Sequence, residues 1–316
     1  MNPTVTALPA AAMVAAARDV LVGRQRDIEV VAAALAAGRS VLLEGPPGTG
    51  KTTLLRALAG GAGVGLVLVE GNAELSPGRL IGHHDPSRVL SDGYRSDTFV
   101  PGPLLQAMTE GALLYVEELN RVPEETLNVL LGVLSERRAQ VPRFGEVLAA
   151  PTFRLVAAMN PFDSVGTGRI TPALYDRTCR VAVGYQSESE EQLIVARVAP
   201  GPERLVEQAV RAVRLTRTHP DLRIGSSVRG AIDVVAVAGE LAGLRGRHDD
   251  VGLDAAITAL SGRVTVREGT GRTPEEIVAE IWAAAGARPS EPEGKASGPG
   301  RPPPAEARTV TGNHHP

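Results

Sequence analysis

The stretch that decides the fold runs from Ser40 to Ala59 and reads SVLLEGPPGTGKTTLLRALA. A short apolar run comes first, then a glycine-rich loop, then a segment with the leucine spacing of a helix. This is the context of a P-loop, in which backbone N–H groups surround phosphate oxygens and the helix N-terminus adds the positive end of its dipole. Every fixed position of that motif is filled over 45–52, so the sequence predicts a phosphate-binding loop.

The loop supplies a defined set of candidate ligands for ATP. Lys51 would reach the β- and γ-phosphates, and the Thr52 hydroxyl would ligate Mg²⁺. A Gly-Pro loop that only caps a strand is the structural alternative, and it is disfavoured because the strand and the helix both stand in place. The candidate cofactor-binding residues are Gly45, Pro46, Pro47, Gly48, Thr49, Gly50, Lys51, Thr52 and Thr53.

A second stretch, LLYVEELNRV over 113–122, ends an apolar run in two adjacent glutamates. A buried strand should not end in paired carboxylates unless something positive or reacting lies there. A P-loop needs one acid for the Mg²⁺ shell, and usually another that polarises the attacking water. We therefore assign Glu117 to the metal and Glu118 to the water. Asp is usual in the first role, so Glu117 would fold back or act through a metal-bound water; an exposed strand-end pair is the alternative interpretation.

Five apolar runs between about Gly38 and Tyr185 predict the fold class: SVLLEG, VGLVLVEG, ALLYVEE, FRLVAAMN and RVAVGY. Continuous runs of this length are typical of parallel strands covered on both faces, so we expect a doubly wound α/β domain. After Tyr185 these runs stop, and capping-box patterns at Ser187 and Thr273 each begin a helical stretch.

The expected organisation has four parts. A flexible leader over 1–19, in which the apolar run is interpreted as a first helix, precedes a nucleotide-binding α/β domain over 20–185. A smaller helical lid domain follows over 186–287, and a Pro-, Gly- and Ser-rich tail over 288–316 is expected to be disordered.

Bulk properties narrow the function. The 316 residues carry a formal net charge of −3, which gives no electrostatic case for broad nucleic-acid binding. The single cysteine, Cys179, excludes an internal disulfide and fits a reducing cytoplasm. We expect no membrane span, because no apolar run approaches the necessary length, and no signal peptide, because no basic region precedes the apolar run Ala10–Ala17.

Taken in order, the motifs resemble those of AAA+ ATPases of the MoxR type over roughly residues 20–285. The segments that carry the resemblance are VGRQRDIEVVAAALAAGRSVLLEGPPGTGKT, LLYVEELNRVPEETLNVLLGVLSERRAQV, FRLVAAMNP, PALYDRTCRV and GSSVRGAI. The family usually has Asp-Glu where this chain has Glu117 and Glu118.

The resemblance implies roles for three further candidate catalytic residues. Asn160 would be the polar sensor-1 residue near the γ-phosphate. Arg177 would be an arginine finger inserted into a neighbouring subunit's site, with Arg180 as the alternative. Arg229 would begin a lid helix and contact phosphate within its own chain.

The resemblance implies an ATP-driven ring, expected to be hexameric in the family's manner, that remodels or activates a partner with a von Willebrand factor A domain. One alternative is a nucleotide-gated assembly scaffold with slow hydrolysis, which Glu117 in place of Asp keeps open. Another is the ATPase subunit of a metal chelatase. A DNA motor is disfavoured by the charge balance.

Two segments resemble insertions of the family: a helix-2 insert over Gly71–Met108 and a hairpin over Gln140–Phe153 that is expected to turn at Gly145. Within the insert, His83, His84 and Asp85 are interpreted as a polar loop instead of a metal site, because no further ligand stands at ligand spacing. A basic stripe is interpreted as a solvated face that could also meet an acidic partner. Its members are Arg204, Arg211, Arg214 and Arg217.

Overall fold

A computed structural model describes residues 5–161, 171–246 and 251–287. Its centre is a parallel five-stranded sheet of order β2-β5-β8-β1-β9. All five apolar runs singled out in the sequence form these strands, which confirms the expected parallel sheet. The strands are β1 (Ser40–Glu44), β2 (Leu66–Glu70), β5 (Leu113–Glu117), β8 (Arg154–Met159) and β9 (Thr178–Ala182).

The strand order brings the motifs to one edge of the sheet. Among the strands of this sheet, β8 is the next after β5 in sequence, and in space it lies between β5 and β1. Because all five strands run parallel, the P-loop after β1, the glutamates at the end of β5 and Asn160 after β8 share the carboxyl edge. Open α/β sheets bind ligands at that edge.

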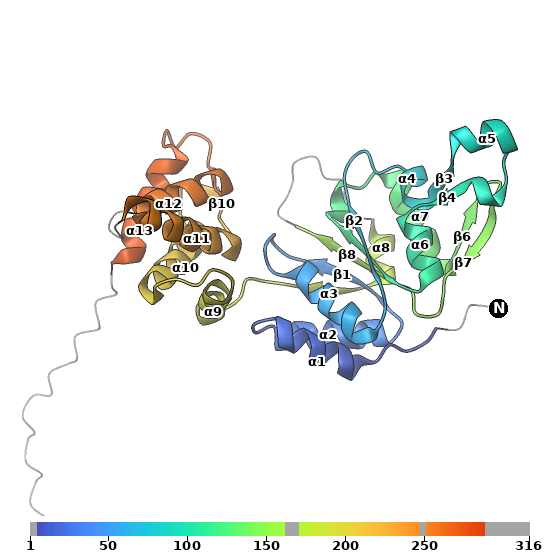
Figure 1. Cartoon of the computed structure of the whole chain (residues 1–316), viewed down its shortest axis with the longest axis horizontal. Helices are drawn as coiled ribbons and strands as arrows, with labels where there is room; N and C mark the ends of the chain where they lie inside the picture. The colour runs from blue at the N-terminus through green and yellow to red at the C-terminus, as the bar shows by residue number, and fades with distance from the viewer. Residues whose placement is uncertain (1–4, 162–170, 247–250, 288–316) are drawn as a thin grey trace, which may run out of the picture.

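Helices cover both faces of the sheet, so the domain is doubly wound (Figure 1). Alternate residues of each strand point to opposite faces: Leu113 and Tyr115 of β5 join one buried cluster, and Leu114 and Val116 join the other. The first cluster is completed by α1 (Ala10–Val20), α2 (Gln25–Ala36) and α3 (Lys51–Ala62). The second is completed by α4 (Pro77–Ile81), α6 (Pro103–Glu110) and α7 (Glu124–Glu136).

The expected first helix forms in the N-terminal segment, but residues 5–20 pack on the domain instead of forming a flexible leader. Helix α1 packs against α3 and buries Met13 and Ala17 completely, and Leu8 before it is also buried. Arg154 at the opposite edge of the sheet adds a second tie, because its guanidinium donates to the Thr6 carbonyl oxygen at 2.6 Å. Small apolar side chains let α1 approach α3 closely, so this helix is part of the packed domain.

The insert and the hairpin project together from the α/β domain (Figure 1). Aromatic contacts join them: the rings of Phe99 and Phe144 have centroids 4.6 Å apart, and the Arg143 guanidinium lies 3.9 Å from the centre of the Tyr94 ring. The insert comprises α4, β3 (Gly82–His84), α5 (Pro86–Asp92), a 3-10 turn η1 (Ser96–Thr98), β4 (Phe99–Pro101) and the start of α6. The hairpin comprises β6 (Arg138–Val141) and β7 (Gly145–Leu148).

Two local expectations are wrong in detail. The hairpin turns over residues 142–144, and Gly145 is already the first residue of β7, paired with Val141. Within the turn Arg143 adopts the left-handed conformation, with φ 61°, and Gly145 also has a positive φ of 114°. His83 and His84 lie in strand β3, and the Asp85 carboxylate caps α5 by accepting from the Ser87 N–H at 2.9 Å.

The C-terminal part of the described chain is helical, as expected. Both predicted capping boxes form, at Ser187 with Glu190 and at Thr273 with Glu276. A small antiparallel pair, β10 (Leu222–Ile224) and β11 (Thr265–Val266), was not expected. The helices are α9 (Glu188–Val198), α10 (Glu203–Thr216), α11 (Val228–Arg245), α12 (Val251–Leu260) and α13 (Pro274–Gly286). The tail predicted over 288–316 lies outside the described residues.

The basic stripe on α10 is not simply a solvated face. Arg214 and Arg217 both bind the buried carboxylate of Glu191 in α9, at 3.2 and 2.7 Å. Arg217 also lies 3.8 Å from the centre of the Tyr185 ring. These two arginines therefore join α10 to α9 and to the linker that leaves β9.

Candidate nucleotide-binding site

The P-loop is held open by backbone conformations that glycine permits. Strand β1 leads into the loop, and α3 begins at Lys51, as the motif predicts. Gly48 has φ 73°, and a Cβ atom there would stand 2.2 Å from the hydroxyl of Ser227, which immediately precedes α11. The loop and the start of α11 are thus in close approach, which places the lid over the phosphate-binding position.

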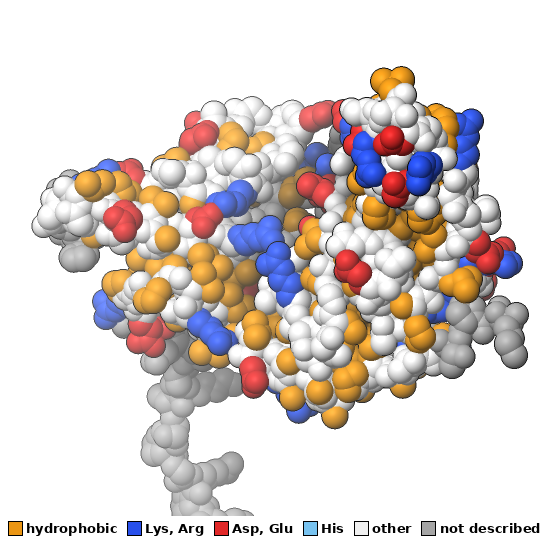
Figure 2. Space-filling view, turned by 45° about the vertical axis from the view of Figure 1, so that its right-hand side comes forward, with side chains coloured by type: hydrophobic (Ala, Val, Ile, Leu, Met, Phe, Trp, Pro, Cys, Tyr) orange, Lys and Arg blue, Asp and Glu red, His pale blue; other side chains and the backbone are white. Residues whose placement is uncertain are grey.

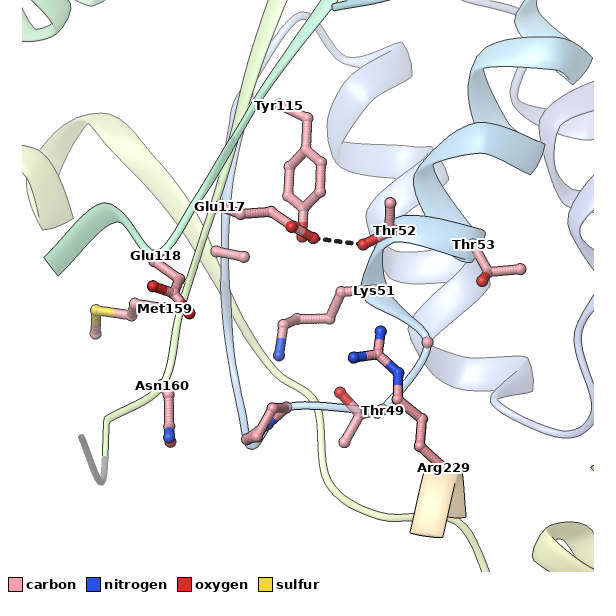
Figure 3. Close-up of a pocket in the computed structure, with 14 residues that line it drawn as sticks. Thr49, Lys51, Thr52, Thr53, Tyr115, Glu117, Glu118, Met159, Asn160 and Arg229 are labelled. Carbon is pink, nitrogen blue, oxygen red and sulfur yellow. Dashed lines mark hydrogen bonds between the residues drawn. The ribbon is translucent and has the colours of Figure 1, made fainter. Parts of the chain in front are cut away.

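Most of the predicted site residues line one pocket (Figure 3). Gly45 and Pro46 are not part of the lining, but their carbonyl oxygens accept hydrogen bonds from the Lys51 ammonium at 2.9 and 2.8 Å. The pocket is lined by Pro47, Gly48, Thr49, Gly50, Lys51, Thr52, Thr53, Tyr115, Glu117, Glu118, Ala158, Met159, Asn160 and Arg229.

The carboxylate of Glu117 reaches across to α3, where it accepts a hydrogen bond from the Thr52 hydroxyl. The longer side chain of Glu therefore meets the P-loop hydroxyl directly. Tyr115, two residues earlier in β5, is fully buried and also faces the pocket. Burial and the nearby Glu117 carboxylate raise the pKa of Tyr115 far above its usual range, so its hydroxyl keeps its proton.

Glu118 has an unusual backbone. Its φ is 48°, in the left-handed region that non-glycine residues seldom adopt and that is enriched at functional sites. Gly71, after β2, donates its N–H to the Glu117 carbonyl oxygen at 2.8 Å, and a Cβ at Gly71 would stand 2.5 Å from the carbonyl oxygen of Glu118. The Glu118 side chain pairs with Arg121 at 3.0 Å and is about half exposed.

Positive charge gathers around the pocket. Figure 2 shows Lys and Arg side chains along the hollow between the helical part and the α/β domain. Burial, together with the charges of Arg24 and Arg229, lowers the pKa of Lys51 to about 8, although Glu117 acts in the opposite direction. Lys51 is thus partly desolvated and lies near two arginines, so the negative charge of a bound polyphosphate would be favourable there.

Sequence reasoning missed Arg24. This residue has φ 57° and a largely buried side chain that pairs with Asp27 at 3.0 Å. It also donates to the carbonyl oxygen of Gly184 at 2.6 Å and to the Gln186 amide oxygen at 3.1 Å. It therefore ties the turn before α2 to the linker between β9 and α9. No local sequence signal distinguishes it from the neighbouring Arg26.

The two candidate fingers lie outside this pocket. Arg177 ends α8 (Pro172–Arg177), is partly exposed, and donates to the Ser135 hydroxyl at 2.7 Å. Arg180 in β9 instead binds the buried carboxylate of Glu44, with both contacts at 2.5 Å. Glu44 directly precedes the P-loop and also accepts from the Tyr175 hydroxyl at 2.9 Å. Arg180 is thus engaged within its own chain.

The residues present fit Mg²⁺ and ATP. The glycine loop offers N–H groups with no Cβ in the way, and Lys51 stands beside it with only carbonyl oxygens as hydrogen-bond partners. Thr52 and Glu117 place a hydroxyl and a carboxylate together, which are the oxygen donors that Mg²⁺ prefers. Among residues 5–161, 171–246 and 251–287, no group of three His, Cys, Asp or Glu side chains could hold a metal on its own.

Comparison with known proteins agrees with this geometry. Residues 40–178 match a family model described as AAA domain (dynein-related subfamily). YojN of Bacillus subtilis (strain 168), an uncharacterized protein, is 34% identical over 180 residues, which cover 56% of this chain and 58% of YojN. SH1500 of Staphylococcus haemolyticus, also uncharacterized, is 36% identical over 149 residues, covering 46% of this chain and 56% of that protein. The chain spans a little over half the length of these relatives.

The fold also matches solved structures. RuvB of Thermotoga maritima, a Holliday junction branch migration motor, superposes with a TM-score of 0.51 at 17% identity, covering 75% of this chain and 70% of RuvB. At that identity the likeness concerns the fold alone. Over the described ranges, no helix has both the length and the apolar character needed to cross a membrane.

Proposed function

We propose that the protein is a Mg²⁺-dependent ATPase that remodels or activates a partner protein, because residues 40–178 match an AAA domain family model and the fold resembles that of AAA+ proteins. One observation carries the proposal: a single pocket gathers groups from four separate parts of the chain. They are Lys51 and Thr52 of the P-loop, the glutamates after β5, Asn160 after β8 and Arg229 of the lid.

Each group has a role that its position supports. The loop N–H groups and Lys51 would bind the β- and γ-phosphates, and Thr52 with Glu117 would hold Mg²⁺. The bound metal would supply charge neutralisation at the phosphates. Glu118, at the pocket mouth, would accept the proton of the attacking water, and Asn160 would orient that water.

Arg177 would complete the site of a neighbouring subunit. One observation supports this assignment over Arg180. Both arginines lie outside the pocket lining of their own chain, but Arg180 is bound to the buried carboxylate of Glu44, whereas Arg177 donates to the Ser135 hydroxyl and the Ala173 carbonyl oxygen. A finger donated to a neighbour requires a head-to-tail interface, and such interfaces close into rings. We therefore propose a homo-oligomeric ring, with a hexamer as the expected form.

The projecting insert and hairpin are the proposed contact with the partner, in the manner of MoxR-type ATPases and their von Willebrand factor A domain partners. The Phe99–Phe144 contact joins them, so together they offer one continuous surface to a partner. A cytoplasmic location is proposed on the single cysteine, which is exposed and free.

A second function, a nucleotide-gated scaffold with slow turnover, is favoured by one observation. The Glu117 carboxylate already engages the Thr52 hydroxyl that Mg²⁺ would need. If that contact persisted with nucleotide bound, Mg²⁺ would be held poorly, and ATP would stay bound while it was hydrolysed only slowly.

Turnover and binding, measured together, test the proposal. The unmodified protein should release phosphate from ATP only with Mg²⁺. Glu118→Gln should bind ATP as tightly but lose turnover about a hundredfold or more, because the amide cannot accept a proton. ATP binding without turnover in the unmodified protein would favour the scaffold, and absence of ATP binding would refute both functions.

A further inference from the structure

Tyr115 is a buried polar residue that the proposed chemistry leaves without a task. Its side chain is fully buried, and its hydroxyl has no hydrogen bond of ordinary geometry with any described residue, although it lies close to the Glu117 carboxylate and the Thr52 hydroxyl. Burying an unpaired hydroxyl costs free energy, about 1–3 kcal/mol from protein data. A phenylalanine would fill the same space in the core without that cost, so the hydroxyl itself requires an explanation.

The position of the hydroxyl supplies one. Residues 115 and 117 lie two apart in β5, so their side chains leave the same side of the strand. Figure 3 shows the Tyr115 ring directed at the end of the Glu117 side chain, with Thr52 beyond it. All three residues line the pocket.

The length of Glu117 gives this arrangement a purpose. A glutamate has one more methylene than the aspartate that is usual in this role, and so one more rotatable bond to fix. In the structure one carboxylate oxygen of Glu117 accepts from the Thr52 hydroxyl. The second carboxylate oxygen of Glu117 receives no hydrogen bond from Thr52, and the protonated Tyr115 hydroxyl lies beside the carboxylate.

We propose that Tyr115 is a positioning residue for the metal-binding carboxylate: in the nucleotide-loaded protein its hydroxyl donates a hydrogen bond to Glu117 and fixes the orientation of that side chain. The inference rests on the proposed function, because it concerns the loaded state. It identifies Tyr115 and Glu117 as a pair that does together what an aspartate does alone. The hydroxyl is therefore unpaired only when the nucleotide site is open.

Tyr115→Phe tests this, since it removes one oxygen atom and leaves the ring. Without nucleotide, its thermal unfolding midpoint should equal or exceed that of the parent, because an unpaired buried hydroxyl is lost. In the presence of ATP, the Mg²⁺ concentration that half-saturates the thermal shift should rise about fivefold to tenfold, as expected for a lost hydrogen bond to a charged group. The shift produced by ATP with EDTA should not change.

Two further variants sharpen the test. Tyr185→Phe removes the same atom from a tyrosine outside the pocket lining and should leave the Mg²⁺ dependence as in the parent. In a Glu117→Asp background, Tyr115→Phe should change the half-saturating Mg²⁺ concentration less than twofold. The shorter aspartate carboxylate should lie out of hydrogen-bonding reach of the Tyr115 hydroxyl.

The outcomes separate the two levels of the argument. If the thermal unfolding midpoint of the unmodified protein does not change when Mg²⁺ and ATP are added, the proposed function and this inference are both overturned. A parent that responds, with a Tyr115→Phe variant that responds at the same Mg²⁺ concentration, overturns only the role of Tyr115. An equal effect of Tyr115→Phe in the Glu117→Asp background would likewise show that the hydroxyl does not act through Glu117.

Discussion

Binding of ATP should draw a proton onto Lys51. Burial lowers the pKa of this ammonium to about 8 in the nucleotide-free protein. The phosphates of ATP would place negative charge beside it, which favours the charged form and returns the pKa toward its ordinary value near 10.4. A group whose pKa is higher in the bound than in the free protein takes up protons on binding, so affinity for ATP must fall as pH rises above 8.

The size of the effect follows from the two pKa values. With a free-state pKa of about 8, the uptake should be about 0.1 proton at pH 7, about 0.5 at pH 8 and about 0.9 at pH 9. Calorimetric titration with Mg²⁺ and ATP, repeated in two buffers of different ionisation enthalpy, measures this number directly. Glu118→Gln protein should be used, so that hydrolysis does not contribute heat.

Lys51→Arg in the same background is the matched control. Arginine stays protonated throughout this range, so the uptake should vanish at pH 8 and pH 9. The reasoning is refuted if the uptake in the lysine protein is independent of pH, or if the arginine variant takes up as many protons. The same depressed pKa predicts that the free energy of unfolding without nucleotide rises between pH 8 and the unfolded-state pKa, because there the unfolded lysine binds more protons than the folded one.

Three further predictions concern the loop, the lid and the base of the sheet. Lys51→Ala should abolish ATP binding in an equilibrium titration, because the phosphates lose their nearest cation; retained micromolar affinity would count against the P-loop assignment. Gly48→Ala should weaken ATP binding at least tenfold through its contact with Ser227, and Ser227→Gly added to it should recover part of the loss; no recovery would place the strain in the backbone alone. Arg154→Met should lower the free energy of unfolding in urea by roughly 3 kcal/mol, because carbonyl oxygens of Thr6, Leu35 and Pro151 lose a buried charged donor; a change below about 1 kcal/mol would mean that water replaces it.

The strands and the P-loop could be predicted because each depends on residues that are close together in the sequence. An apolar run covered on both faces is continuous in sequence, and a phosphate loop needs its residues at fixed spacing. The two capping boxes are equally local and form as predicted. The roles of Glu118, Asn160 and Arg177 remain predictions, although the pocket brings the first two together.

What could not be predicted depends on partners distant in sequence. Arg217 looks like a surface residue until Glu191, 26 positions away, is found beside it. Tyr115 reads as one more apolar core position because its relation to the P-loop arises only when α3 packs against β5. The turn of the hairpin was misplaced because Arg143, whose residue type seldom adopts positive φ, takes a left-handed conformation within it, and Gly145 already pairs with Val141.

The packing of the N-terminal helix, although not the helix itself, escaped prediction for a related reason. Alanines bury little area each, so an alanine-rich run carries a weak signal for packing. Its order depends on the fit of α1 against α3 and on Arg154, 148 positions from Thr6.

The central claim, that a working ATPase site is built from two subunits, is tested most directly by mixing two inactive variants. Arg177→Ala subunits keep a sound P-loop, Glu118 and Asn160 but lack the finger. Lys51→Ala subunits have a dead site but an intact Arg177. Randomly mixed in equal amounts, about one quarter of all sites should pair an intact P-loop with an intact finger, if each site has one neighbour that donates to it.

Phosphate release should therefore recover to about one quarter of the unmodified rate, where each variant alone is inactive, and it should fall on dilution as the rings dissociate. Subunit exchange is checked separately, by energy transfer between labelled copies of the two variants. Mixtures that exchange subunits and stay inactive at every ratio would contradict the account, because the site would then be complete within one chain or would use Arg180.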